Sequence, residues 1–255
     1  MSTPAMPVPA PSAESSPALS EGERLINVFI APSKTFTDLK RKASWFVPWL
    51  LLAVVSYAFI GAVAQKVGLR QATENQMRLN TKAQERMAQM PAEQRERGME
   101  ISVMVTKVIL FFVPLIALLI YLIIAAVLMG SFNFGLGAEI PFGTSLAIAI
   151  YAQFPMIIRS VLSVVALYAG ADPEGFTFDN PVASNLGYFV DIGAHPALHA
   201  LAAAVDVFSI WVIVLTGIGF ACMSKIKKST AIAVVFAWYA LYILILKVAP
   251  AALFG

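Results

Sequence analysis

The sequence predicts an all-α, polytopic integral membrane bundle of five transmembrane helices with an N-terminal amphipathic interfacial segment. Five apolar stretches are each close to or above the about 20 residues that a helix needs to cross a bilayer core. Apolar residues make up 59% of the chain and charged residues 13%, against about 25% charged residues in a soluble domain. In lipid the backbone must hydrogen-bond within the protein, so we expect spanning helices. The predicted spans are 46–64, 103–129, 143–169, 197–223 and 229–249.

Composition excludes several function classes. A soluble enzyme does not fit so apolar a chain, and the net charge of +3 is too small to indicate a nucleic-acid partner. Cys222 is the only cysteine, so no internal disulfide or cysteine metal cluster is possible. No hydrolase, metalloprotease or phosphate-binding motif is present. We therefore expect no enzymatic activity and no cofactor.

The N-terminal region predicts a tail followed by an interfacial segment. Residues 1–20 are rich in Pro, Ala and Ser and are expected to be a disordered tail. Ser20 and Glu23 fit a capping box that begins a helix. Residues 21–43 combine apolar and basic residues, which is typical of a helix in the membrane interface; the alternative is a basic flank that only orients the first span. The residues expected to face lipid and its anionic headgroups are Lys34, Phe36, Leu39, Lys40, Arg41 and Lys42.

Residues 66–100 separate the first two spans and are dense in charge. Apolar residues at helical spacing and favourable pairs such as Glu74 with Arg78 predict helices, which Pro91 divides. We expect a polar helical arm outside the membrane. It is either a partner-binding arm or a solvated connector whose methionines pack on the bundle.

The distribution of Lys and Arg predicts the topology. Basic residues precede the first span and fill the last connection, 224–228, whereas the third connection, 170–195, contains neither Lys nor Arg. The positive-inside rule then places the N-terminus in the cytoplasm and, with five spans, the C-terminus outside. The seven basic residues of 66–100 conflict with this assignment.

Ionisable residues within the spans mark a candidate site. At about 1.5 Å per residue, Arg159 and Asp206 both lie about 15–16 Å below the outer boundary, on consecutive antiparallel helices. We therefore predict an Arg159–Asp206 ion pair. It is either a structural pair that decides which helices face each other, or part of a proton or ion pathway. Lys107 and Lys247 lie closer to the outer boundary and are expected to extend to it.

Prolines interrupt two of the predicted spans. Pro114 and Pro155 each remove a backbone hydrogen bond and predict a kink. Gln153 and Arg159 flank the second kink, which makes it either a hinge or polar niche, or only a static bend.

The spacing of one acidic residue and two histidines resembles that of a metal site, but the residues between them argue against it. Asp191, His195 and His199 recur at i,i+4, as ligands on one helical face do. Gly193 and Pro196 interrupt such a helix, so we expect no metal site.

Several segments resemble the Yip family of Ypt/Rab-interacting membrane proteins, and most closely its bacterial-type members. The segment from Phe29 to Phe36, Phe-Ile-Ala-Pro-Ser-Lys-Thr-Phe, followed by a basic run and Trp45, is similar to the start of the Yip domain. Phe142-Gly-Thr-Ser and Tyr151-Ala-Gln-Phe-Pro resemble its third span. Asp206-Val-Phe-Ser-Ile-Trp and the later Gly217-Ile-Gly resemble its fourth. The resemblance covers residues 21–255.

The resemblance implies five spans with a cytoplasmic N-terminus, in the cytoplasmic membrane of a bacterium. Eukaryotic Yip proteins are similar to this chain in their membrane part, and they act in vesicle traffic by binding prenylated Rab GTPases. The N-terminal tail expected here is shorter than their cytosolic region, so the resemblance does not extend to a GTPase role. We expect a non-enzymatic protein that organises the membrane or recruits protein partners through the N-terminal segment or the arm at 66–100. The alternative is a small transporter, channel or lipid-moving protein that uses Arg159 and Asp206.

Overall fold

A computed structural model describes residues 17–79, 81–190 and 195–254, and in these ranges the chain is helical apart from its connections and one isolated β-bridge. Four helical segments are long and apolar enough to span a membrane, namely Phe46–Lys66, Ala92–Gly135, Phe142–Tyr168 and Lys228–Leu253. The prediction of an all-α membrane bundle is confirmed. The remaining apolar stretch contains a shorter helix, Val207–Met223.

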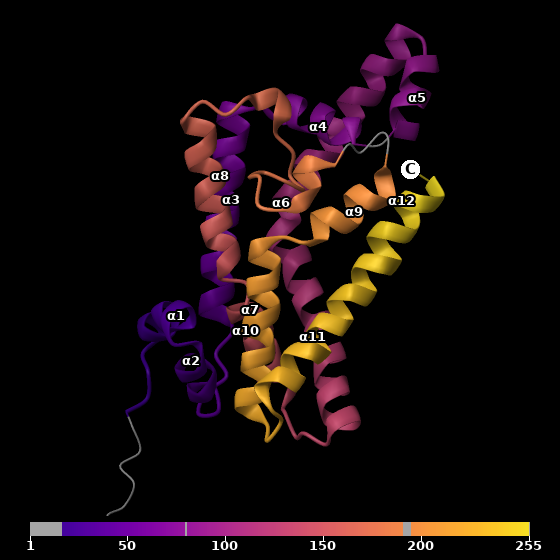
Figure 1. The fold of residues 1–255 in the computed structure, drawn as a ribbon. Coiled ribbons are helices and arrows are strands. Elements are labelled where there is room, and N and C mark those ends of the chain that lie inside the picture. Colours follow the sequence, from indigo (N-terminus) through magenta and orange to yellow (C-terminus); the bar gives the residue numbers. More distant parts are fainter. Residues whose placement is uncertain (1–16, 80, 191–194, 255) are drawn as a thin grey trace, which may run out of the picture.

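The first two helices form a short hairpin at one end of the bundle (Figure 1). Helix α1 spans Glu21–Ile30 and α2 spans Pro32–Asp38. The predicted capping box is confirmed, because Ser20 Oγ accepts from the Glu23 amide and the Glu23 carboxylate accepts from the Ser20 amide. Most of the tail predicted at 1–20 lies outside the described residues.

The hairpin is docked on protein. Helix α2 packs against α10 (Val207–Met223), and Phe36 and Leu39 are 0% and 1% exposed. The prediction that these two side chains face lipid is therefore wrong. They lie in the core because α10 presents small residues there: a Cβ on Gly219 would lie 2.4 Å from Ile148 Cγ2 and 3.2 Å from Phe36 Cδ1.

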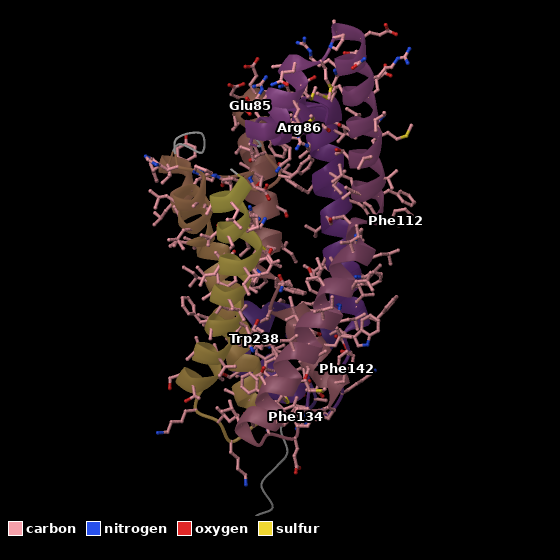
Figure 2. The ribbon with its side chains drawn as sticks, turned by 90° about the vertical axis from the view of Figure 1, so that its right-hand side faces the viewer. Glu85, Arg86, Phe112, Phe134, Phe142 and Trp238 are labelled. Carbon is pink, nitrogen blue, oxygen red and sulfur yellow. The ribbon has the colours of Figure 1, made fainter. Side chains whose placement is uncertain are left out.

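The arm begins directly after the first span. Helix α3 covers Phe46–Lys66, and Gly68 then turns the chain with a φ of 82° into α4 (Leu69–Arg78). Helix α5 (Thr81–Gln89) follows. In Figure 2, Glu85 and Arg86 lie in the upper part of the molecule, towards the opposite end from Phe134.

The second span is continuous with the arm. Helix α6 runs from Ala92 to Gly130 through Pro114, and a π-helical turn, η1 (Ser131–Gly135), follows it. The last residues of the predicted arm and the predicted span 103–129 therefore belong to one helix, and the boundary predicted between them at 100–103 stays a prediction. Pro91 does separate α5 from α6, at the N-cap of α6, where its missing N–H costs no hydrogen bond.

The last three predicted spans are built differently from one another. Helices α7 (Phe142–Tyr151) and α8 (Pro155–Tyr168) are joined by a short turn, with Pro155 as the first residue of α8. The predicted span 197–223 is divided into α9 (Pro196–Ala204) and α10, with Asp206 as the N-cap of α10. Helix α11 (Lys228–Ile243) continues through the π-helical η4 (Leu244–Val248) into α12 (Ala249–Phe254).

The connection between α8 and α9 enters the bundle. It contains two 3₁₀ turns, η2 (Pro173–Gly175) and η3 (Leu186–Phe189), and Asn185 forms an antiparallel β-bridge with Asp206. In Figure 1 this connection descends from the top of α8 to the junction of α9 and α10, and α12 ends at the opposite end from α1 and α2.

Candidate functional site

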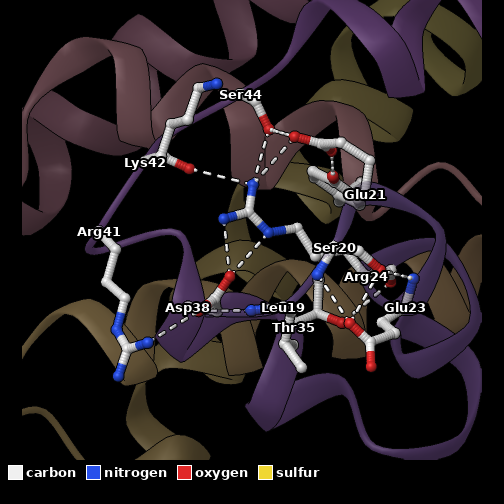
Figure 3. A network of polar contacts seen from close by, with 11 residues as sticks. Leu19, Ser20, Glu21, Glu23, Arg24, Thr35, Asp38, Arg41, Lys42 and Ser44 are labelled. Carbon is white, nitrogen blue, oxygen red and sulfur yellow. Dashed lines mark hydrogen bonds and ion pairs between the residues drawn. The ribbon is translucent and has the colours of Figure 1, made fainter. Parts of the chain in front are cut away.

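The N-terminal hairpin is held by an ion pair that is sealed from solvent (Figure 3). Arg24 and Asp38 are 3% and 7% exposed, and both Nε and Nη2 of Arg24 donate to Asp38 Oδ2, at 2.8 and 2.7 Å. Thr35 Oγ1 also donates to the Arg24 carbonyl at 3.0 Å. The pair joins α1 to α2 and sets the angle between them.

A second set of contacts joins the same arginine to the bundle. Arg24 Nη1 donates to Ser44 Oγ at 2.7 Å, to the Lys42 carbonyl at 3.2 Å and to Glu21 Oε1 at 3.2 Å. The Tyr151 hydroxyl on α7 donates to Glu21 Oε2 at 2.8 Å. The guanidinium of Arg24 therefore connects α1 to α2 and to the residues just before the first span. Through Glu21, the same group of contacts reaches α7.

The charge of Arg24 is retained in this buried position. Burial alone lowers the pKa of the guanidinium, but hydrogen bonding and charge attraction from Asp38, with a further contribution from Glu21, outweigh burial and raise the pKa. Asp38 also lies 3.9 Å from Arg41 Nη1, so this carboxylate faces both the buried guanidinium and one of the exposed basic residues that follow α2.

Exposed cations from two distant segments meet at this end of the molecule. Lys228 Nζ donates to Ser33 Oγ at 3.2 Å, which places the α10–α11 connection beside α2. Glu23 and Glu139 are the exposed carboxylates of α1 and of the α6–α7 connection. The exposed cations of the two segments are Lys34, Lys40, Arg41, Lys42, Lys225, Lys227 and Lys228, and we call this set the basic end.

The cations of the N-terminal segment are exposed as predicted, whereas the apolar residues that are exposed differ from the predicted ones. Ile26 and Ile30 on α1 are 63% and 76% exposed, whereas Phe36 and Leu39 are buried. The i,i+4 spacing of Ile26 and Ile30 was visible in the sequence. What the sequence did not contain was the position of α10, which covers the apolar face of α2.

The predicted ion pair between Arg159 and Asp206 is not formed. Among the described residues no nitrogen of Arg159 lies within 4 Å of an Asp206 oxygen; Nη2 of Arg159 instead donates to the Asp179 carbonyl at 2.7 Å. Arg159 Nε is buried without a hydrogen-bond partner in the described part of the chain. The depth estimate assumed two uninterrupted helices, and the break before α10 together with the entering α8–α9 connection changes both positions.

Asp206 acts as a helix cap. It is 5% exposed, its Oδ2 accepts from the Ser209 amide at 2.8 Å, and its Oδ1 accepts from the Ser184 hydroxyl. Asn185 beside it is 7% exposed, and its Oδ1 has no partner among the described residues. Arg159, Asp206 and Asn185 therefore belong to one polar region around the α8–α9 connection, although they are not paired directly.

The two prolines of the predicted spans occupy different positions: Pro155 is the first residue of a helix, and Pro114 lies inside one. Pro155 begins α8, and Gln153 lies half-buried in the turn before it. Around Pro114, two side chains of α3 donate to carbonyls of α6: Trp49 Nε1 to Pro114 at 3.2 Å and the Tyr57 hydroxyl to Phe111 at 2.6 Å. These bonds join α3 to α6 within one turn of the Leu110 carbonyl, which Pro114 leaves without its intrahelical donor.

The arm is anchored at α4. Asn75, 2% exposed, donates from Nδ2 to the carbonyls of Pro173 and Phe176 at 2.8 and 2.9 Å. Arg70 makes two 2.8 Å bonds to the Glu96 carboxylate on α6. The part of the arm that projects is α5 (Figure 1), and both alternatives for the arm, partner binding or a solvated connector, stay predictions.

Of the three residues with the spacing of metal ligands, Asp191, His195 and His199, the first lies outside the described residues. His199 Nδ1 lies 2.8 Å from the Val190 carbonyl. Within the described ranges no group of three or more His, Cys, Asp or Glu side chains is placed to hold a metal ion.

Comparison with known proteins gives one match. The family model of the Yip1 domain matches residues 26–248, which is most of the chain. Comparison with curated proteins and with solved structures gives no significant match.

Proposed function

Because this chain belongs to the Yip1 domain family, a family of membrane proteins, we propose that it is a non-enzymatic multi-pass protein that organises the membrane and recruits partners at its basic end. One observation carries the proposal: residues 34–42 and residues 225–228 lie next to each other and form one exposed cationic surface. Cations grouped at a membrane surface attract anionic headgroups by about 1 kcal/mol each.

We propose five spans, with α9 and α10 together forming a broken fourth span. The basic end would lie in the cytoplasm and the C-terminus outside. Two features support this topology: the hairpin of α1 and α2 and the end of α12 lie at opposite ends of the bundle (Figure 1), and the positive-inside rule favours the cytoplasm for the basic end. The membrane is proposed to be a bacterial cytoplasmic membrane, following the resemblance to bacterial-type members.

The experiment compares the lipids that remain bound to the protein. Wild-type protein and the variant Lys225→Gln/Lys227→Gln/Lys228→Gln are extracted in polymer nanodiscs from vesicles of mixed anionic and zwitterionic lipid. The wild type is expected to retain several-fold more anionic lipid than the bulk ratio, and the variant to lose most of this enrichment. Raising the salt concentration should reduce the enrichment as well, because exposed charges are screened.

A matched control removes three cations from the other end. Arg78, Arg86 and Arg95 are exposed on the arm, so Arg78→Gln/Arg86→Gln/Arg95→Gln changes the net charge equally. Equal loss of anionic lipid in both triple variants would contradict a localised basic end. Partner recruitment is tested by site-specific crosslinking from Arg41 and Arg86 in intact membranes. A specific partner should crosslink from Arg41 and not from Arg86, and crosslinking from Arg86 alone would contradict recruitment at the basic end.

The second candidate is a transporter, channel or lipid-moving protein. The broken span favours it, together with Arg159 Nε and Asn185 Oδ1, which are buried without a partner among the described residues. Discontinuous helices with polar groups line the sites of many transporters. Proteoliposomes that hold wild type, Arg159→Met or Asp206→Asn would be compared for proton, ion and lipid flux. Flux in wild type that both variants abolish would replace the first proposal with this one.

A further inference from the structure

A cavity of about 170 Å³ lies between α3, α6 and α8. It runs along α3 from Trp49, in the first turn, to Phe59, and at about 1.5 Å per residue this is about 15 Å. That length is half of the about 30 Å hydrocarbon core. The cavity is smaller than the about 300–1,000 Å³ of sites for drug-sized ligands, which excludes a bulky ligand. Its length along α3 together with its small volume suits a single alkyl chain.

The cavity is apolar apart from three hydroxyl groups. Its lining contains no charged residue, and its polar side chains other than Trp49 are Ser56, Tyr121 and Ser160. Trp49 is already engaged, since Nε1 donates to the Pro114 carbonyl. An ionic headgroup would be unpaired here, which disfavours a phosphate or a carboxylate.

The three hydroxyls of the lining differ from other serines of the spans, because no internal hydrogen bond engages them in the described part of the chain. Serine hydroxyls in membrane helices commonly bond the carbonyl four residues earlier, as Ser163 does with Arg159 at 2.8 Å and Ser131 with Val127 at 2.9 Å. In the described part of the chain, Ser56, Tyr121 and Ser160 make no hydrogen bond, although each side chain is only partly exposed. Hydroxyl groups in the lining of an apolar cavity offer a neutral oxygen both donors and acceptors.

We propose that this cavity binds the chain of a neutral single-chain amphiphile, with its hydroxyl group bonded to Ser56, Tyr121 and Ser160. The ligand class is a long-chain alcohol. This site is separate from the basic end, and the inference stands whether or not the basic end binds anionic lipid.

Trp49 lines the cavity and reports on its occupant. A variant with Trp45, Trp211 and Trp238 changed to Phe keeps Trp49 as the only tryptophan. In nanodiscs of zwitterionic lipid, 9,10-dibromooctadecanol should quench Trp49 saturably at a small mole fraction. The matched dibromooctadecane lacks the hydroxyl and should quench only weakly and without saturation.

Two further variants test the site itself. Ala117→Phe fills the cavity and should abolish saturable quenching; Ala117→Leu replaces it if the larger residue prevents folding. The change Ser56→Ala/Tyr121→Phe/Ser160→Ala should weaken binding of the alcohol about tenfold, which is the loss of about one to three net hydrogen bonds. Ser163→Ala, whose hydroxyl is already bonded to Arg159, is the control and should bind as before.

Two results would overturn the proposal. Equal quenching by the alcohol and the alkane would mean that the hydroxyls select nothing. Saturable quenching by a brominated acyl chain of phosphatidylcholine, lost in Ala117→Phe, would mean that an ordinary bilayer chain occupies the cavity.

Discussion

Arg24 and Asp38 form a buried ion pair in which two guanidinium nitrogens contact one carboxylate oxygen, at 2.7 and 2.8 Å. The two residues are 14 positions apart and belong to different helices of the N-terminal hairpin. The remaining Arg24 donors reach Ser44 and the Lys42 carbonyl. The pair therefore attaches the basic residues that follow α2 to the membrane bundle.

Removing one partner of this pair is predicted to be strongly destabilising. Arg24→Met leaves Asp38 buried and uncompensated, and breaking such a pair costs about 3–5 kcal/mol. The measurement is thermal unfolding of the purified protein in detergent. The double change Arg24→Met/Asp38→Leu should recover much of the loss, since no buried charge then remains.

The control for this prediction is Arg41→Met. Arg41 lies 3.9 Å from the other oxygen of Asp38 and is 44% exposed, so its loss should cost at most about 1 kcal/mol. If Arg24→Met and Arg41→Met are equally mild, the buried pair does not hold the hairpin.

Gly219 is predicted to tolerate no side chain. Because a Cβ there would lie 2.4 Å from Ile148 Cγ2, Gly219→Ala should destabilise the bundle by about 1–3 kcal/mol through overpacking. Ile148→Ala should relieve part of this cost in the double variant. Gly143→Ala is the matched control, since a Cβ at Gly143 meets nothing within 4 Å; unfolding midpoints of the four proteins decide the question.

Exchanging the charges of Arg159 and Asp206 is predicted not to restore stability. Asp206 caps α10 through the Ser209 amide, so Asp206→Ala should lose about 0.5–2 kcal/mol, whereas Asp206→Ser keeps a capping oxygen and should lose less. Arg159→Asp/Asp206→Arg removes the cap and should be at least as unstable as Asp206→Ala. Recovery of wild-type stability by the exchange would show that the two residues pair after all.

The start of α1 is predicted to loosen in acid. The Ser20 amide, followed by the Ser20 hydroxyl, donates to the Glu23 carboxylate and lowers its pKa below the ordinary 4.5. A lowered folded-state pKa stabilises the cap above pH 4.5, and this contribution is lost as the pH falls through the lowered value. Hydrogen exchange of the Ser20 amide should therefore accelerate in that range. In Glu23→Gln the exchange should lack this titration; an unchanged titration would assign it to another group.

For the basic residues of the N-terminal region, part of the arrangement could be predicted from the sequence. Their exposure and their common side with residues 225–228 followed from the number of spans and from charge placement. The orientation of Phe36 did not follow, because an apolar helical face looks the same whether it meets lipid or protein. The same limit explains Arg159 and Asp206, whose depth was estimated on the assumption of unbroken helices.

The sequence by itself determined that this chain is a helical membrane protein, because long apolar runs in lipid can satisfy their backbone only as helices. It also determined the capping box and the Yip1 resemblance, which depend on local residues. Tertiary structure decided which groups meet: Arg24 with Asp38, Lys228 with Ser33, and Asp206 with Ser184. Such contacts join residues that are distant in the chain, and they depend on small residues such as Gly219 that let helices approach closely.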